Sequence, residues 1–257
     1  MSQTIEPVSP STPEKTAIVV GASAGMGAAI VRRLAAQGYT VAALARREDP
    51  LRQLASECEE LPGRVLVRVH DVANDAQVPA LFEELVRELG SLELIVFTAG
   101  IMPEIGPEEF DTHKDLEILK INTGGCIAWF NPAAELFQSQ RSGTLIGVSS
   151  IAGDRGRRGN PAYCTSKAAM NTYLEALRNR LCVHGVKVCT IRPGYIDTDM
   201  TKGMEGLFWL ISADQAAESI LKAARGGANV RYVPFRWAIV GLVIRNIPSF
   251  VFRRLNL

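Results

Sequence analysis

Histidine is scarce in this chain, and its cysteines lack any paired spacing. There are three histidines and five cysteines, and no cysteine belongs to a C-x-x-C motif. An odd, unpaired set of cysteines indicates neither a disulfide framework nor a zinc site, and it is typical of a reducing, cytoplasmic setting. Because His70, His113 and His184 are far apart in the sequence, we expect surface or loop histidines and no bound metal.

The chain also lacks a strong net charge and a long apolar run. A net charge of +1 at pH 7 gives no general case for nucleic-acid binding. The opening segment, MSQTIEPVSPSTPEK, holds three prolines and no apolar run, so we expect residues 1–14 to form a disordered leader and not a signal peptide. The apolar run from Trp237 to Ile244 is far shorter than the roughly 20 residues that span a bilayer.

What the sequence does contain is a regular alternation of strand and helix patterns. Its 257 residues are 47% hydrophobic, which is enough for a large core. Short apolar, β-branched runs such as TAIVV, RVLVRVH and KVCTI alternate with helical stretches. This alternation predicts an α/β fold: a single-domain, Rossmann-like, doubly wound parallel sheet flanked by helices, with ligands at the carboxyl ends of the strands.

A glycine-rich turn follows the first predicted strand. The segment from Gly21 to Gly27 has the spacing G-x-x-x-G-x-G and precedes a helical pattern. Glycines let backbone N–H groups and a helix N-terminus approach a pyrophosphate closely, so the turn favours dinucleotide binding. A turn that serves only packing is the alternative.

The second predicted strand ends in Arg46 and Arg47, about 20 residues after the glycine turn. An acidic residue at this position binds the ribose 2′-hydroxyl of NAD, whereas arginine accommodates the extra phosphate of NADP. The pair therefore favours NADP(H), with an ordinary solvated arginine pair as the alternative.

Ser150, Tyr163 and Lys167 stand out between residues 149 and 167, because they place two hydroxyl groups and an ammonium group in one short stretch. Tyr163 opens a helical pattern, and Lys167 lies one turn later on the same face. An ammonium group beside a phenol favours the phenolate, so we expect Lys167 to lower the pKa of Tyr163 toward the range of a general acid or base. The alternative is an exposed Tyr/Lys pair.

These features occur together and in order with several others. Asp71-Val72, Ala99-Gly100, Asn122, Ser150 and the segment from Pro193-Gly194 to Thr198 complete the set. Over about residues 15 to 226 the chain resembles the classical short-chain dehydrogenase/reductase family. The domain organisation expected is a leader over 1–14, a catalytic domain over 15–229 and a basic amphipathic tail over 230–257.

The resemblance implies a set of catalytic residues. Tyr163 would exchange a proton with the reacting oxygen, and Ser150, in preference to the adjacent Ser149, would hydrogen-bond that oxygen. Lys167 would hold the nicotinamide ribose, and Asn122 would keep a water in the proton relay. The chain departs from the family at Phe97-Thr98, where two asparagines are common, and this affects the expected local hydrogen bonding.

The resemblance also implies a set of cofactor-binding residues. Ser23 and Arg46 would meet the 2′-phosphate of NADP(H), Asp71 and Val72 the adenine, and Ile196 and Thr198 the carboxamide. The full set expected is Gly21, Ser23, Ala24, Gly25, Met26, Gly27, Arg46, Arg47, Asp71, Val72, Ala99, Gly100, Asn122, Tyr163, Lys167, Pro193, Gly194, Ile196 and Thr198.

The loop between Ser150 and Tyr163 and the lid after Thr198 bear on the substrate. The loop carries Asp154, Arg155, Arg157 and Arg158, which favour structural ion pairs, with an anionic substrate as the alternative. The lid, residues 200–212, is strongly apolar, which favours a lipophilic ligand.

The tail is basic and aromatic. From residue 230 to the end there are five arginines and no Asp or Glu. Such a segment fits a peripheral membrane contact, while an oligomer contact or a flap over the substrate pocket is the alternative. Tail and loop together resemble, more loosely, a bacterial subgroup of the family that includes partners of epimerases acting on polyprenyl-phosphate sugars.

The resulting functional prediction is an NADPH-dependent carbonyl reductase, reversible in principle, that acts on a lipophilic ketone or a keto-sugar lipid at a membrane surface. A soluble reductase of secondary metabolites such as polyketides or steroids, and a non-catalytic NADP(H) sensor, are the alternatives. We expect a homodimer or homotetramer in the cytoplasm, peripheral at the inner face of the membrane if the tail binds lipid, with no nucleic-acid partner.

Overall fold

A parallel seven-stranded sheet organises the chain. The computed structural model describes residues 15–106 and 108–255, so the predicted leader and the last two residues of the tail lie outside it. The strand order is β3-β2-β1-β4-β5-β6-β9. The strands are β1 (Thr16–Val20), β2 (Thr40–Ala45), β3 (Arg64–Val69), β4 (Leu94–Phe97), β5 (Thr144–Val148), β6 (Lys187–Pro193) and β9 (Val230–Val233).

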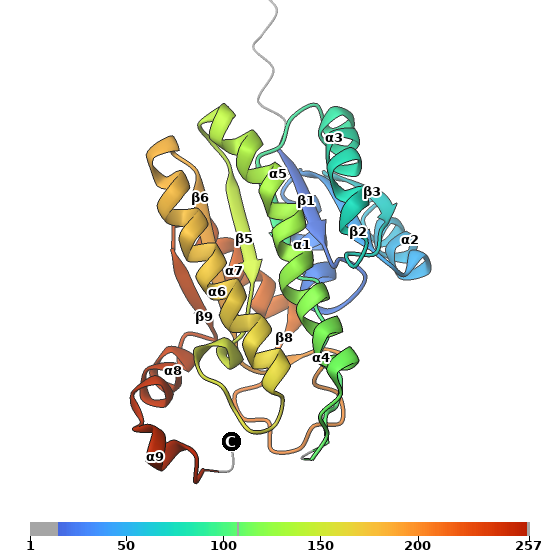
Figure 1. The fold of residues 1–257 in the computed structure, drawn as a ribbon. Helices are drawn as coiled ribbons and strands as arrows, with labels where there is room; N and C mark the ends of the chain where they lie inside the picture. Colours follow the sequence, from blue (N-terminus) through green and yellow to red (C-terminus); the bar gives the residue numbers. More distant parts are fainter. Residues whose placement is uncertain (1–14, 107, 256–257) are drawn as a thin grey trace, which may run out of the picture.

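Helices cover both faces of this sheet (Figure 1). Side chains of successive strand residues point to opposite faces, so in β2 Val41 and Ala43 join one core cluster while Ala42 and Leu44 join the other. One face is covered by α1 (Gly25–Ala36), α2 (Glu48–Glu57) and α7 (Ala213–Arg225), and the other by α3 (Val78–Leu89), α5 (Gly125–Gln140) and α6 (Pro161–Leu181). The predicted doubly wound α/β fold with a single domain is confirmed.

Two of the helical segments include turns that are not α-helical. A 3-10 turn, Asp75–Gln77, precedes α3. The segment around Asn122 is divided into α4 (Thr112–Leu119), a π-helical turn over Lys120–Gly124 and then α5. Such π-turns alter side-chain directions within a helix and often occur at functional sites.

The last part of the chain contributes to the sheet before it leaves the core. Val230–Val233 forms β9, which pairs in parallel with β6, so the sheet extends past the boundary expected at residue 229. Two short helices follow, α8 (Trp237–Asn246) and α9 (Ser249–Phe252). Within residues 15–106 and 108–255, none of the helices combines the length and the apolar character that crossing a bilayer requires.

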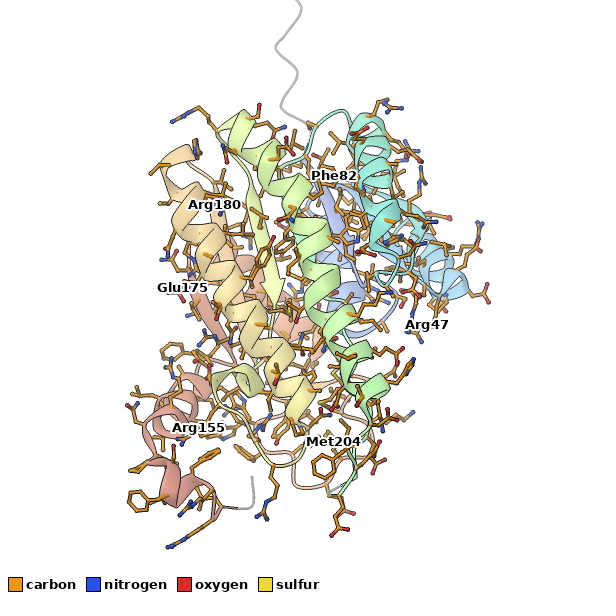
Figure 2. All side chains as sticks on the ribbon, in the orientation of Figure 1. Arg47, Phe82, Arg155, Glu175, Arg180 and Met204 are labelled. Atoms are coloured by element: carbon orange, nitrogen blue, oxygen red, sulfur yellow. The ribbon has the colours of Figure 1, made fainter. Side chains whose placement is uncertain are left out.

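The two ends of the sheet differ in what surrounds them. α8 and α9 lie at the carboxyl end of the strands, together with the lid (Figure 1). Arg155 and Met204 lie at this end of the molecule, whereas Arg180 lies toward the opposite end (Figure 2). A second, two-stranded parallel sheet, β7 (Ile196–Asp197) with β8 (Ile211–Ser212), pairs the two ends of the lid region.

Candidate active site

The glycine turn between β1 and α1 packs its backbone closely against neighbouring segments of the chain. Gly21 has a φ of 93°, in the left-handed region that favours glycine. The N–H groups of Gly21 and Ala22 donate to the carbonyl of Leu44 at 2.8 and 2.9 Å, which anchors the turn to the end of β2. A Cβ atom on Gly27 would collide with the carbonyl oxygen of Gly21. The turn therefore depends on glycine at both ends.

Thr98 holds the same turn from the neighbouring strand. Its hydroxyl lies 3.0 Å from the carbonyl oxygens of Val20 and Gly21 and donates to them. At the position where the chain departs from the family pattern, Thr98 therefore supplies hydrogen bonds that tie β4 to the glycine turn.

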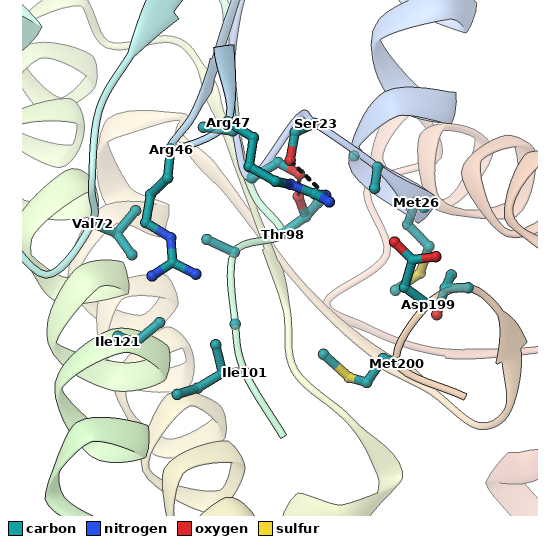
Figure 3. Close-up of a pocket in the computed structure, with 18 of the residues that line it drawn as sticks. Ser23, Met26, Arg46, Arg47, Val72, Thr98, Ile101, Ile121, Asp199 and Met200 are labelled. Carbon is teal, nitrogen blue, oxygen red and sulfur yellow. Dashed lines mark hydrogen bonds between the residues drawn. The ribbon is translucent and has the colours of Figure 1, made fainter. Parts of the chain in front are cut away.

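A cavity of about 300 Å³ opens in front of this turn (Figure 3). It lies at the carboxyl ends of β1, β2 and β4, where ligands bind in doubly wound sheets. Thirteen of the predicted cofactor-binding residues line it: Gly21, Ser23, Ala24, Gly25, Met26, Gly27, Arg46, Arg47, Asp71, Val72, Ala99, Gly100 and Thr198. The remaining six, Asn122, Tyr163, Lys167, Pro193, Gly194 and Ile196, do not line it.

Gly100 joins this cavity to the predicted catalytic residues. A Cβ atom on Gly100 would lie 3.1 Å from Asn122 Oδ1 and 3.5 Å from Lys167 Nζ. One glycine thus lines the cavity and packs against two catalytic candidates. Their proximity to the cavity would allow both to serve one ligand.

The two arginines after β2 take different roles. Arg47 donates to Ser23 Oγ at 3.1 Å, whereas Arg46 lies beside Val72 and is 3.9 Å from Asp71 Oδ2 (Figure 3). The structure therefore places Arg47, and not Arg46, against the predicted phosphate-contacting Ser23.

Sequence reasoning missed seven residues that line the cavity. They are Ala45, His70, Thr98, Ile101, Ile121, Asp199 and Met200, most of them neighbours of predicted residues. His70 lies just after β3, outside any helix or strand, as expected for a loop residue, but it is not on the surface: it is 4% exposed and packs edge-on against Trp129. Neither ring nitrogen has a partner among the described residues, and burial lowers the pKa of His70.

Tyr163 is positioned by the start of α6. Asn160 caps the helix by accepting a hydrogen bond from Tyr163 N at 3.0 Å, and Pro161 occupies the first turn, where its missing N–H costs nothing. Tyr163 and Lys167 are both buried, so they are not an exposed pair.

The two adjacent serine hydroxyls have different partners. Ser149 Oγ donates to the carbonyl of Lys167 at 3.0 Å, which commits it to the helix backbone. Ser150 Oγ accepts from Ala152 N at 3.0 Å, and hydrogen bonding by Ser150 offsets part of the rise that burial causes in the pKa of Tyr163. This arrangement supports the choice of Ser150.

The expected effect of Lys167 on Tyr163 is not found. Burial raises the pKa of Tyr163, and the Ser150 hydroxyl and the positive charge of Arg157 offset part of that rise. Lys167 Nζ lies 5.7 Å from the ring centroid and donates to Val148 O at 3.1 Å. Its own pKa is lowered by burial to about 8, so the lysine shares the apolar surroundings that keep the phenol neutral.

Asn122 lies in the π-helical turn and is fully buried. Its Oδ1 accepts from Ile101 N at 2.8 Å, and its Nδ2 donates to Ile101 O and Ser166 Oγ, each at 3.0 Å. The amide therefore fixes the chain after Gly100 against α6.

The segment after β6 carries the lid side of the site. Thr198 packs against Gly25, where a Cβ would come within 2.9 Å of Thr198 Cγ2. Pro193 pairs with Val233 of β9, and Gly194 faces α8, since a Cβ on Gly194 would collide with the indole of Trp237. Trp237 stacks on Phe208 of the lid, with ring centroids 4.9 Å apart.

Two charged residues of the loop before Tyr163 are structural. Asp154 Oδ1 accepts from Arg192 at 2.8 Å, and its Oδ2 accepts from Tyr232 at 2.8 Å. Arg155 donates to the carbonyls of Ile244 and Ile247. Burial raises the pKa of Tyr163, and the positive charge of Arg157 offsets part of that rise.

With a glycine cradle beside a buried Ser-Tyr-Lys set on a doubly wound sheet, the site defines a nucleotide-dependent oxidoreductase fold. Residues 15–206 match the model of the short chain dehydrogenase family. This match covers most of the chain, so the chain belongs to that family. It is an oxidoreductase of a family that binds a nicotinamide cofactor.

Individual relatives agree with this assignment. The chain is 30% identical over 240 residues to an uncharacterized oxidoreductase of Myxococcus xanthus, covering 93% of this chain and 94% of the relative. It is 31% identical over 191 residues to a 3-oxoacyl-[acyl-carrier-protein] reductase of Bos taurus, covering 74% and 79%.

Solved structures share the fold. A short-chain type dehydrogenase/reductase from Mycobacterium ulcerans superposes with a TM-score of 0.79 at 23% identity, covering 94% of this chain and 98% of that one. A variant of an actinorhodin polyketide ketoreductase, determined with NADPH, gives a TM-score of 0.76 at 21% identity, covering 84% and 94%.

Proposed function

We propose that the protein is an NADPH-dependent oxidoreductase that interconverts a lipophilic ketone and the corresponding secondary alcohol, with Tyr163 as general acid and base. The observation that carries the proposal is the burial of Tyr163 and Lys167 together, one helical turn apart in α6, directly after the loop that begins at Ser150. Gly100 links this set to the cavity at the glycine turn.

The residues present fit the cofactor. A Cβ atom on Gly21, Gly25 or Gly27 would collide with Ala99, Thr198 or the Gly21 carbonyl, so only glycine allows this tight turn beside the N-terminus of α1, which favours a pyrophosphate. When bound there, NADPH supplies the hydride. Asp71 and Val72 would contact the adenine, and Thr198 the carboxamide.

The remaining chemistry belongs to the protein. In ketone reduction Tyr163 donates its phenolic proton to the carbonyl oxygen, and in alcohol oxidation it accepts the proton. Ser150 hydrogen-bonds the same oxygen as charge develops on it. Lys167 holds the ribose end of the site, and Asn122 keeps the relay behind the lysine in place.

The decisive test is Tyr163→Phe, with Tyr173→Phe as the matched control on the same helix. Tyr173 hydrogen-bonds Asn131 on the outer side of α6 and α5. We expect Tyr163→Phe to bind NADPH almost as tightly as the wild type and to lose turnover by a factor of about 10² or more. Turnover close to that of the wild type would refute the mechanism.

NADP(H) preference rests on Ser23 and Arg47. Their hydrogen bond gives a hydroxyl and a guanidinium at one point, a pair suited to a 2′-phosphate. We expect Arg47→Gln to weaken NADPH binding about tenfold and to leave NADH binding nearly unchanged. Arg46→Gln is the matched comparison, because Arg46 leans toward Asp71. Equal losses for both cofactors in Arg47→Gln would argue against the phosphate contact.

The lipophilic substrate follows from the lid. Phe208, Trp209 and Leu210 form an apolar stretch that packs on Trp237 through Phe208 and Trp209. Lids of this kind cover apolar ligands and exclude water. We include a peripheral contact of the basic tail with the inner face of the membrane in this proposal, as the source of a lipid-linked substrate.

A second candidate is a reductase of acyl or polyketide ketones, favoured by the relatives of those names. A panel of carbonyl substrates with NADPH oxidation as readout separates the two. Consumption of lipid-extract ketones supports the first, and preference for soluble β-ketothioesters supports the second. We expect a homodimer or homotetramer in either case, which sedimentation equilibrium measures.

A further inference from the structure

Exposed apolar side chains gather at the carboxyl end of the sheet from two segments far apart in sequence. Leu210 of the lid is 43% exposed, and on α8 Ile239 and Leu242 are 63% and 58% exposed. The full group is Met204, Phe208, Trp209 and Leu210 with Phe235, Ile239, Leu242, Val243, Phe250 and Val251, which we call the docking face. Exposed apolar groups of this extent mark an interaction site.

The lid and the C-terminal helices meet directly within this face. Trp237 at the start of α8 stacks on Phe208 at 4.9 Å and contacts Trp209 edge-on at 5.6 Å. The Arg236 guanidinium lies 4.9 Å from the ring centroid of Trp209. The two segments are therefore one surface, and a partner that binds one of them lies against the other.

Helix α8 has apolar side chains on the face that packs against the protein and also on its solvent-exposed face. It buries Trp237 and Gly241, one turn apart, against the body of the protein. Ile239, Leu242 and Val243 are left exposed. A helix that is hydrophobic nearly all round needs a second apolar contact.

The C-terminal helices are held in one orientation by the loop that precedes Tyr163. Arg155 donates to Ile244 O at 2.7 Å and to Ile247 O, and its guanidinium lies 4.0 Å from the ring centroid of Phe252. A Cβ on Gly241 would crowd Asp154 and Tyr232, so glycine allows α8 to approach closely. The apolar residues of α8 are thus presented outward by a fixed support.

Charge identifies the partner. The C-terminal segment that carries much of this face holds five arginines and no Asp or Glu from residue 230 to the end of the chain, and the lid adds one acidic residue, Glu205. Two of these arginines lie over aromatic rings of the face, Arg231 over Phe235 and Arg236 over Trp209. A second copy of the chain would bring the same arginines together, whereas an anionic lipid surface complements them.

We propose that the lid and the C-terminal helices form a single face that docks on an anionic bilayer, with the apolar side chains inserted among the lipids and the arginines at the headgroups. This docking proposal deepens the proposed function. Only one consequence of it rests on that function, namely that a lipophilic substrate enters the site directly from the bilayer without crossing water.

The experiment is cosedimentation of the full-length chain with vesicles of phosphatidylglycerol and phosphatidylcholine, and with vesicles of phosphatidylcholine alone. Ile239→Glu tests the tail and Leu210→Glu the lid. Val183→Glu is the control, because Val183 is 70% exposed in the turn between α6 and β6, at the amino end of the strands. Thermal unfolding confirms that each variant is folded.

We expect the wild type to bind the anionic vesicles, to release them at high salt and to bind phosphatidylcholine weakly. Ile239→Glu and Leu210→Glu should each reduce partitioning about tenfold, while Val183→Glu should match the wild type.

Three outcomes would overturn the proposal: no binding of the wild type to anionic vesicles, loss in Ile239→Glu with none in Leu210→Glu, or self-association through the face without vesicle binding. The assay uses neither NADPH nor turnover, so its failure is separate from failure of the Tyr163→Phe test.

Discussion

The guanidinium of Arg192 donates a hydrogen bond to the Asp154 carboxylate at 2.8 Å, and the Asp154 side chain is only 1% exposed. This pair joins the end of β6 to the loop between Ser150 and Tyr163. Tyr232 of β9 donates to the other oxygen of the same carboxylate. The buried carboxylate of Asp154 therefore connects β6 and β9 to the loop between Ser150 and Tyr163, and this loop also holds the C-terminal helices.

Asp154→Asn should destabilise the protein by about 3 kcal/mol, because it leaves the partly buried Arg192 without its counter-charge. Urea unfolding followed by circular dichroism measures the change. Asp214→Asn is the control, since its ion pair with Arg33 at 2.6 Å is solvent-exposed and should be worth less than about 1 kcal/mol. Similar losses in both variants would contradict the importance of burial.

Lys167→Met should stabilise the apoprotein near neutral pH while it abolishes efficient turnover. The folded-state pKa of Lys167 is about 8 instead of the ordinary 10.5. Below pH 8 the lysine is charged in both states and the folded state bears the full cost of burying it. Between pH 8 and pH 10.5 Lys167 loses its proton in the folded state but keeps it in the unfolded state, so the free-energy cost of burial decreases. Above pH 10.5 that cost is gone.

The shift corresponds to at most about 3 kcal/mol, and loss of the hydrogen bond to Val148 reduces the gain. Unfolding by urea at neutral pH and above pH 10 measures the difference, with the exposed Lys222→Met as control. If the wild type and Lys167→Met differ in unfolding free energy by the same amount at neutral pH and above pH 10, the prediction is contradicted.

Arg157→Gln should move the pH profile of catalysis to higher pH. The positive charge of Arg157 lowers the pKa of Tyr163, so its removal raises that pKa. Alcohol oxidation needs the phenolate and would begin at higher pH, while ketone reduction would persist to higher pH. The neighbouring Arg158→Gln serves as control, and equal profiles for the two variants would show that Arg157 does not act on the phenol.

Thr98→Val keeps the shape of the side chain and removes its hydrogen bonds to Val20 and Gly21. We expect a loss of about 1 kcal/mol in unfolding free energy, because the hydroxyl shares one proton between the two carbonyls and Val20 O keeps the backbone donors Thr98 N and Ala99 N. NADPH should bind more weakly as the glycine turn loosens, which fluorescence titration measures. Unchanged affinity together with unchanged stability would show that the turn is held without Thr98.

Much of the fold and of the site depends on short spacings, and these could be predicted. The glycine turn, the Arg46-Arg47 pair and the four-residue interval from Tyr163 to Lys167 are local patterns whose meaning follows from strand and helix geometry. Alternation of apolar strands with helices was sufficient for the doubly wound sheet, because parallel strands require helical crossovers.

Contacts between distant segments decided the rest. The sequence does not say that Arg47 and not Arg46 meets Ser23, that His70 is buried against Trp129, or that Lys167 turns to Val148 while Tyr163 stays neutral. Asp154 and Arg155 follow no local pattern either, since their partners lie up to 94 residues away. The sequence by itself determined which groups the protein carries and at what local spacing. Only the tertiary structure decided which of them are buried and paired, because burial and long-range packing set pKa values and partners.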